Sequence, residues 1–358
     1  MVALLFGGTF LPAAAQSKVD SKAGQATVDP ASLVWPGPPE KPRVRFVTAV
    51  TGEHDVTGPV KLSWVDRLAG KKPARERLRL SKPYGVAADP AGRVYVADGA
   101  LRAIVVIDHA GKQTTLWMGN GQFPLSVPMG LAFDGQQRLF VSDAYRGQIV
   151  VFSPDGRPVA GFGQGTLGRP GGMAVDAARN RLYVADAKAS QVFVFNTSTL
   201  ELERTIGVKW SGKPKRFTDG MLAGPTNVAV DSRGSVYVVD TIGCKIQVFD
   251  ADGRFLRSLG SQGVEPGRFI RPKGIAIDSQ DHVYVADSAF NNFQILTPDG
   301  QPLMFVGAGG DQPGQFMLPA GLYIDSRDRV YVTEQRLDGG RLQIFQYLAD
   351  AESARSGQ

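Results

Sequence analysis

The chain has 358 residues, 43% of them hydrophobic, and a formal net charge of +6 at pH 7. It is long and apolar enough to bury a large core, and its 43 glycines and 23 prolines indicate many turns. The single cysteine, Cys244, excludes an internal disulfide, a thiolate metal cluster and a covalently attached haem, so we interpret it as a structural residue.

The first fifteen residues have the pattern of a secretory signal. An apolar run at 2–11 is followed by three alanines at 13–15, which fit a small-residue cleavage site. No positive charge precedes the run, so we expect the true start to lie upstream; the alternative is a buried or disordered tail. The pattern predicts an extracytoplasmic protein, periplasmic or secreted. We expect no membrane span, because no other long apolar run follows.

The segment between this signal and the first repeat divides into three parts. Residues 16–42 are polar and rich in proline, which predicts a flexible linker. Residues 43–50 are rich in β-branched and aromatic residues, which favour a strand. Residues 52–82 hold a predicted short helix at 63–70 followed by a basic stretch. We expect this third part to cross one face of the domain.

One pattern is repeated six times along the rest of the chain. Each copy begins with a proline, has an aspartate six residues later, and runs into a strand such as Tyr-Val-Ala-Asp that ends in an acid. The copies begin at residues 83, 128, 170, 225, 272 and 319. The strand-end acids are Asp98, Asp143, Asp186, Asp240, Asp287 and Glu334. Repeats of this length with four short strands per unit are typical of a β-propeller.

Five copies contain four strands, whereas the sixth ends after its third. We expect the strand at 43–50 to supply the missing outer strand, because ring closure removes the exposed sheet edges between the first and last blades. The sequence therefore predicts an all-β, six-bladed β-propeller over residues 43–348, closed by an N-terminal strand, with a polar tail at 349–358.

The repeats resemble those of NHL-repeat propellers. The resemblance rests on the opening Pro-x-Gly-x-Ala-x-Asp at 272–278, on the Tyr-Val-Ala-Asp strand, and on the third strand Ile-Gln-Val-Phe at 246–249. It covers residues 83–345, and the stretch 33–43 is similar to that of bacterial extracytoplasmic members. The resemblance implies a six-bladed fold and little about chemistry, because function resides in sites grafted onto a fold.

The acid that ends the second strand is present in every copy, so we assign it a task that every blade needs. We expect these side chains to accept hydrogen bonds from backbone N–H groups of the loops rather than to act in catalysis.

Strand order places the loops between second and third strands and the connectors between blades on one face, called here the top face. Basic residues outnumber acids there, and a positive face attracts anions. The longest connector, 208–224, contributes Lys209, Trp210, Lys213, Lys215, Arg216 and Phe217. The shorter loops and connectors contribute Arg102, Arg146, Lys188, Lys245 and Arg271 as candidate binding residues, and Arg169, Arg268, Arg336 and Arg341 as further charge.

These charges predict that the top face holds an acidic protein or an anionic envelope polymer. The protein would then be a non-catalytic binding or scaffold module without a cofactor. Nucleic acid is not expected as a partner, because a secreted protein rarely meets it. The alternative is a solvated face with no ligand.

Two kinds of propeller enzyme compete with this interpretation. A histidine-dependent enzyme is not favoured, because His54 precedes the repeats while His109 and His282 fall in turns of the bottom face. A calcium-dependent lactonase or esterase, as in gluconolactonase-like propellers, is the alternative, since hard cations take carboxylate and amide oxygens.

The candidate calcium ligands are residues at which the repeat changes. Asn227 stands where the other copies have glycine, Glu334 stands where they have aspartate, and with Asp240 they would form an oxygen-rich mouth. Asparagine also replaces glycine where the backbone is left-handed, which is the structural explanation for Asn227.

Overall fold

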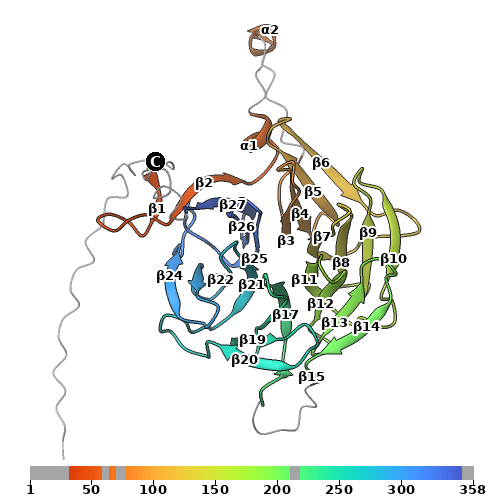
Figure 1. Cartoon of the computed structure of the whole chain (residues 1–358). Helices are drawn as coiled ribbons and strands as arrows, with labels where there is room; N and C mark the ends of the chain where they lie inside the picture. The colour runs from red at the N-terminus through yellow and green to blue at the C-terminus, as the bar shows by residue number, and fades with distance from the viewer. Residues whose placement is uncertain (1–31, 59–63, 70–77, 210–217, 349–358) are drawn as a thin grey trace, which may run out of the picture.

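Six sheets stand around a central channel, so the predicted six-bladed β-propeller is confirmed (Figure 1). The structure is a computed structural model that describes residues 32–58, 64–69, 78–209 and 218–348. The predicted signal at 1–15 and the tail at 349–358 lie outside the described residues.

Each blade is an antiparallel meander whose strands follow the sequence from the channel outwards. The innermost strands begin at the repeat proline: β3 (Pro83–Ala88), β7 (Pro128–Phe133), β11 (Pro170–Asp176), β17 (Pro225–Val230), β21 (Pro272–Ile277) and β25 (Pro319–Ile324). The second strands contain the strand-end acid: β4 (Val94–Asp98), β8 (Leu139–Asp143), β12 (Arg181–Asp186), β18 (Val236–Asp240), β22 (Val283–Asp287) and β26 (Arg329–Arg336).

The third and fourth strands complete the blades. The third strands are β5 (Ala103–Asp108), β9 (Gln148–Phe152), β13 (Gln191–Asn196), β19 (Lys245–Phe249), β23 (Asn292–Leu296) and β27 (Gly339–Tyr347). The outer strands are β6 (Gln113–Met118), β10 (Pro158–Phe162), β14 (Leu202–Ile206), β20 (Phe255–Leu259), β24 (Pro302–Val306) and, in blade six, β2 (Val44–Val50). A short parallel pair, β15 (Val208–Lys209) and β16 (Met221–Leu222), flanks the longest connector.

The core lies between neighbouring blades rather than within one sheet. Every residue of β18 is buried, because this strand has a blade on either side. Val239 of β18 belongs to the same cluster as Ile275 of β21 and Val285 of β22, in the next blade. Outer strands instead alternate exposed and covered residues, as β20 does. Each Tyr-Val-Ala-Asp segment therefore supplies apolar surface to two neighbours at once, which explains its near-continuous hydrophobic character.

The aspartate that lies six residues after each repeat proline accepts hydrogen bonds within the bottom turn of its blade. In blade one, Asp89 accepts hydrogen bonds from the Arg93 backbone and guanidinium and from the Tyr95 hydroxyl, at 2.9, 2.6 and 3.0 Å. Asp325 of blade six is bonded in the same way to Arg329 and the Tyr331 hydroxyl. This half of the repeat pattern is therefore structural.

The N-terminal strand closes the ring as predicted. β2 pairs with β27 over its whole length, from Val44 opposite Tyr347 to Val50 opposite Leu342. The Phe46 ring packs edge-on against Phe345, with ring centroids 5.6 Å apart. Blade six thus consists of strands from both ends of the propeller domain.

The prediction of a flexible linker over 16–42 differs from the structure in its second part. β1 (Val34–Trp35) adds a fifth strand to blade six beyond β2. The Trp35 ring contacts Phe345 at 5.7 Å between centroids, and the Phe46 N–H donates to the Leu33 carbonyl. Leu33 and Trp35 cover the outer edge of the blade-six core, so the chain packs on the propeller from before residue 43. Residues 16–31 of the predicted linker lie outside the described residues.

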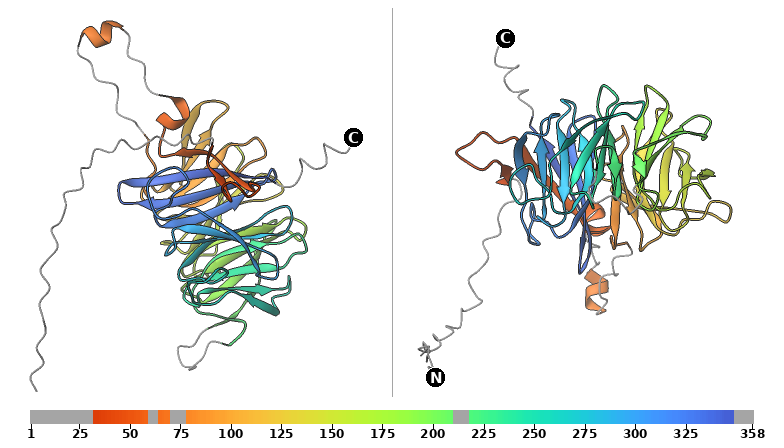
Figure 2. Two further views of the ribbon diagram at one scale, coloured as in Figure 1. Left: turned by 90° about the vertical axis from the view of Figure 1, so that its left-hand side faces the viewer. Right: turned by 90° about the horizontal axis from the view of Figure 1, so that it is seen from below.

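The segment between β2 and blade one forms a long loop whose two ends are joined by backbone hydrogen bonds. The Leu80 N–H donates to the Thr51 carbonyl and the Glu53 N–H donates to the Leu78 carbonyl. The loop holds α1 (His54–Thr57) and α2 (Trp64–Leu68), and Figure 2 shows α2 standing away from the sheets. The predicted helix is thus present, but the short stretch 79–82 rather than the whole segment leads to the innermost strand. No helix among the described residues is long and apolar enough to cross a membrane.

Ring closure can be tested by truncation from the N-terminus. Deleting residues 1–51 removes β2, uncovers the edge of β27 and takes Val44, Phe46 and Val50 out of the core. We expect aggregation or a fall in melting temperature of about 10 °C or more, since losing several large core side chains removes several kcal/mol.

Two shorter truncations serve as controls. Deleting 1–31 leaves every described strand intact and should leave the melting temperature unchanged, whereas deleting 1–42 should give an intermediate loss. A 1–51 deletion as stable as the 1–31 deletion would refute closure by β2.

Candidate functional site

The strand-end acids hold the top face together. All six side chains are fully buried, and the set is Asp98, Asp143, Asp186, Asp240, Asp287 and Glu334. Asp186 accepts hydrogen bonds from the backbone N–H groups of Gly168 and Arg169 in the preceding connector and of Lys188 and Ala189 in the following loop. Asp143 has the corresponding four donors in blade two. The prediction that these acids accept loop N–H groups is confirmed.

Blade six replaces part of this backbone pattern with an ion pair. The Glu334 carboxylate contacts the Arg341 guanidinium and accepts the Met317 N–H at 2.6 Å. Arg341 also donates to the carbonyls of Asp311 and Gln315. Arg341 is 4% exposed, so it adds no charge to the top surface, contrary to the sequence-based expectation.

Two other cations counted for the top face are neutralised there. Arg336 pairs with Asp338 at 3.0 Å and Arg268 pairs with Glu265 at 3.2 Å. The positive character of the face therefore rests on fewer residues than the sequence indicates.

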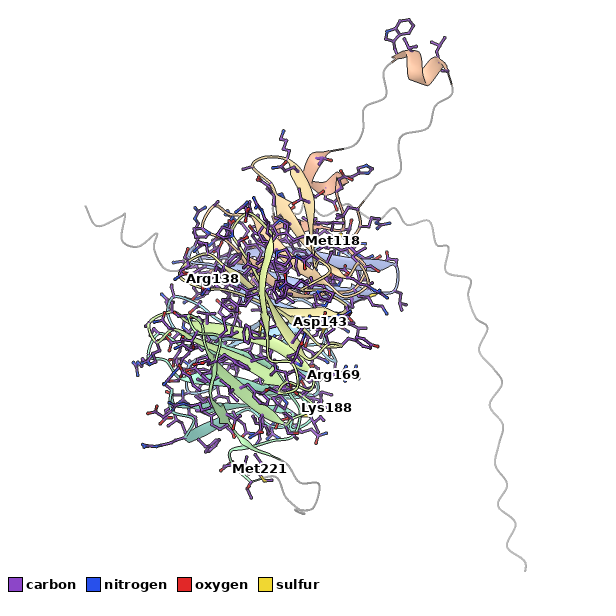
Figure 3. The ribbon with its side chains drawn as sticks, turned by 90° about the vertical axis from the view of Figure 1, so that its right-hand side faces the viewer. Met118, Arg138, Asp143, Arg169, Lys188 and Met221 are labelled. Atoms are coloured by element: carbon purple, nitrogen blue, oxygen red, sulfur yellow. The ribbon has the colours of Figure 1, made fainter. Side chains whose placement is uncertain are left out.

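Two of the remaining cations, Arg169 and Lys188, face a hollow of about 550 Å³ at the top mouth of the channel, called here the funnel. Arg169, Lys188 and Lys273 line it, and none of its described lining residues is acidic. Figure 3, an edge-on view, shows Arg169 and Lys188 on one side of the ring and Arg138, from a bottom turn, on the other. The apolar part of the lining comes mainly from Met129, Pro170, Pro225 and Ile242.

Lys273 was not among the residues predicted for binding. It follows Pro272 within β21, a strand that the sequence assigns to the core. The residues directly after the repeat prolines nevertheless line the funnel in five blades: Tyr84, Met129, Gly171, Thr226 and Lys273. Aligning the six copies at their prolines would therefore identify these funnel residues from the sequence.

The surroundings of the funnel shift the pKa of two of its residues. Burial lowers the pKa of the half-buried Lys273, and the nearby positive charges of Arg271 and Arg169 lower it further. Burial raises the pKa of Tyr84 to about 12, against the opposing effect of Arg169. The Tyr84 hydroxyl therefore stays protonated at neutral pH and can donate a hydrogen bond.

Two hydroxyl groups of the funnel lining donate hydrogen bonds to other groups of the protein. Thr241 donates to the Pro272 carbonyl at 2.6 Å, and the hydroxyls of Thr226 and Thr241 lie 2.7 Å apart. Because Thr241 has a single hydroxyl hydrogen, Thr226 is the donor in the second bond. The first bond joins blade four to blade five and the second lies within blade four. Together they leave the cations and Tyr84 as the main side-chain donors of the funnel.

Below the funnel lies the channel, with a volume of about 320 Å³, lined mostly by glycines and residues with apolar side chains. Five glycines and Asn227 stand two residues after the repeat prolines, and none of the six has a left-handed backbone. The left-handed explanation for Asn227 is therefore wrong. The residues at these positions are small because the innermost strands of neighbouring blades lie close together. A Cβ on Gly321, for example, would lie 1.8 Å from the Tyr84 carbonyl oxygen. At blade three the space beside Gly172 is filled by the Asn227 amide.

The three alternative calcium ligands do not line one pocket. Asn227 faces the channel and its Oδ1 accepts the Val228 N–H, whereas Asp240 and Glu334 are buried beneath the connectors of blades four and six. In the part of the chain that the structure describes, no group of three His, Cys, Asp or Glu side chains could hold a metal ion.

The histidines and the cysteine lie where the sequence indicates. His109 follows β5 and His282 pairs with Asp278 at 2.9 Å, both in bottom turns, and none of the three histidines lines the funnel or the channel. Cys244 is half-buried, its thiol lies 3.2 Å from the Ile270 carbonyl, and burial raises its pKa. A raised thiol pKa agrees with a structural role.

Outside the funnel, the rim of the top face combines charge with exposed apolar side chains. Arg102 and Arg146 are exposed and Lys245 is half-exposed. Tyr145 and Leu337 occupy the same family of loops with 79% and 99% of their surfaces exposed, which the sequence analysis missed. The connector residues Trp210, Lys213, Lys215, Arg216 and Phe217 lie outside the described residues, as does the side chain of Lys209.

The comparisons with known proteins agree with the fold. A family model described as "6-bladed beta-propeller" matches residues 218–294, and an NHL-repeat model matches residues 167–195, so the resemblance to NHL-type propellers is confirmed. No protein of curated function matches the sequence.

Solved structures show the same architecture at low identity. A protein of unknown function from Bacteroides thetaiotaomicron has a TM-score of 0.62 at 16% identity, covering 85% of this chain and 76% of its own. An auxiliary nutrient binding protein from the same organism has 0.56 at 16%, covering 75% and 70%. Virginiamycin B lyase from Staphylococcus aureus has 0.52 at 12%, covering 75% and 96%. A lyase and a binding protein thus share this fold, and the likeness shows the fold alone.

The contact between Gly172 and Asn227 can be tested with paired substitutions. Gly172→Ala places a Cβ 1.9 Å from the Asn227 Oδ1, so it should destabilise the protein, and Asn227→Gly should reduce that cost. Gly321→Ala instead meets a backbone carbonyl, so it should cost about 2 kcal/mol or more whatever residue 227 is. Chemical denaturation measures both couplings. Equal costs of Gly172→Ala with and without Asn227 would contradict this account of the channel.

Proposed function

We propose that the protein is an extracytoplasmic, non-catalytic binding or scaffold propeller that holds an acidic protein on its top face. The observation that carries the proposal is the rim, where exposed Arg102 and Arg146 lie in the same family of loops as exposed Tyr145 and Leu337. Neither arginine takes part in a salt bridge among the described residues, although Arg146 donates a hydrogen bond to the Ser126 hydroxyl. Surfaces that combine aromatic anchors with unpaired arginine are typical of protein interfaces.

The apolar component favours a protein over an anionic envelope polymer. A polymer of repeated anionic groups requires charge along its path, whereas Tyr145 and Leu337 offer flat or branched apolar surface that a protein partner can cover. The long connector supports the same choice from its sequence, because Trp210 and Phe217 stand among Lys213, Lys215 and Arg216.

Two features support binding over catalysis. The histidines lie away from the funnel, and the strand-end carboxylates are occupied by connector and loop donors, so neither supplies a general base at the top mouth. The proposed location rests on the signal pattern at residues 1–15. It also makes nucleic acid an unsuitable partner.

The proposal is tested by capturing a partner from the envelope fraction and measuring its binding kinetics. The charge-reversal triple Arg102→Glu, Arg146→Glu, Lys245→Glu should slow association at least tenfold at low salt and much less at high salt, because exposed charge mainly steers encounter. Tyr145→Ala with Leu337→Ala should instead speed dissociation at any salt.

A matched control reverses the same number of charges on the bottom face. Arg233→Glu, Arg254→Glu and Arg327→Glu lie in bottom turns, so their combination should leave partner binding unchanged. If the top and bottom triples weaken capture equally, only net charge matters and the top-face proposal fails.

A further inference from the structure

The geometry of the funnel points to a second binding site: we infer that it takes a small organic molecule carrying an oxyanion, a carboxylate or a phosphate. This inference goes beyond the proposed function, because the funnel and the rim use different residues. Arg169, Lys188 and Lys273 supply the funnel's charge, and separate variants can remove either surface.

The funnel carries positive charge that no acidic side chain of its described lining balances. Three cations from blades three and five line one hollow, and no acidic side chain is among its described lining residues. Arg271 adds a fourth positive charge close to Lys273. Like charges held together in a partly desolvated hollow oppose folding, so an arrangement of this kind is typical of a site that an anion completes.

The side chains of the funnel that are available to a ligand are mainly hydrogen-bond donors. The hydroxyls of Thr226 and Thr241 are used within the protein, so the remaining side-chain donors are the cations and the protonated Tyr84. The described lining has no carboxylate or amide side chain to accept hydrogen bonds from a ligand. A neutral sugar, which needs acceptors as well as donors, fits this set less well than an oxyanion does.

Size and apolar lining distinguish a small molecule from a bare ion. The funnel's volume of about 550 Å³ lies in the range of small-molecule sites. Met129 and Ile242 face the same hollow as the cations, so there is apolar surface for the body of the ligand.

The two cations of blade three are held in place by one buried carboxylate. Asp186 accepts the backbone N–H of Arg169 and that of Lys188, each at 3.0 Å. The Lys188 stem also lies close to Gly168, where an added Cβ would come within 3.0 Å of it. This arrangement fixes the cation backbones before a ligand arrives, which lowers the entropy lost on binding.

The test uses two probes, inorganic phosphate and succinate, with glucose as a neutral control, in titration calorimetry of the mature protein. The parent should bind phosphate, succinate or both, and should not bind glucose. The double variant Arg169→Gln, Lys273→Met should weaken the bound probe at least tenfold, while Arg102→Gln on the rim should leave it unchanged. Phosphate binding alone or succinate binding alone identifies the oxyanion that the funnel takes.

A second readout does not depend on knowing the natural ligand. Without any probe, Lys273→Met should melt at the same temperature as the parent or higher, because it removes a desolvated cation from beside two arginines. A phosphate-induced rise in melting temperature should be smaller in this variant than in the parent.

Several outcomes would overturn the inference. One is that neither probe binds the parent more tightly than the double variant. Another is that the double variant loses the protein partner while no small anion binds, which would make the funnel part of the partner surface. Loss of partner binding in the rim variants with phosphate binding intact would support two separate sites.

Discussion

The buried carboxylate at the end of each second strand is the interaction on which the top face depends. In blade three, Asp186 reaches from β12 to the connector before β11 and to the loop after β12, and binds four backbone N–H groups. A fully buried carboxylate is tolerated only when it is well supplied with hydrogen-bond donors. The connector and the loop are therefore fixed to each other, and so is everything that they carry.

This constraint separates structure from function within one repeat. The aspartate of the bottom turn and the strand-end acid are both used by the fold, so neither is free for chemistry. Other positions of the repeat are not bound to one residue type by the fold. They are the residue directly after each repeat proline and the loop residues after each strand-end acid. Lys273 occupies the first kind of position and Lys188 the second, and both face the funnel. The repeated positions build the ring, and the residues proposed for binding stand at positions that differ between the copies.

Most of the fold follows from the sequence, because repeats determine it many times over. The strand boundaries and the role of the acids are local consequences of a pattern present six times, and the closing strand follows from the fourth strand that the sixth copy lacks. β1 could not be foreseen, since a proline-rich stretch gives no periodic signal and the contact of Trp35 with Phe345 is a tertiary one. The charge of the top face was overestimated, because Arg341 turns inward to Glu334, and which arginines pair is a tertiary property. Lys273 was missed because a strand position was taken as core.

Two matched substitutions test most directly whether the strand-end carboxylates build the funnel as well as the fold. Asp186→Asn and Asp143→Asn each disturb a carboxylate with four backbone donors, but only the donors of Asp186 include the funnel cations Arg169 and Lys188. The account predicts similar losses of stability, of about 1–3 kcal/mol, in chemical denaturation. It also predicts that the affinity for whichever probe the parent binds, phosphate or succinate, falls in Asp186→Asn alone. Equal affinity for that probe in the two variants would contradict it.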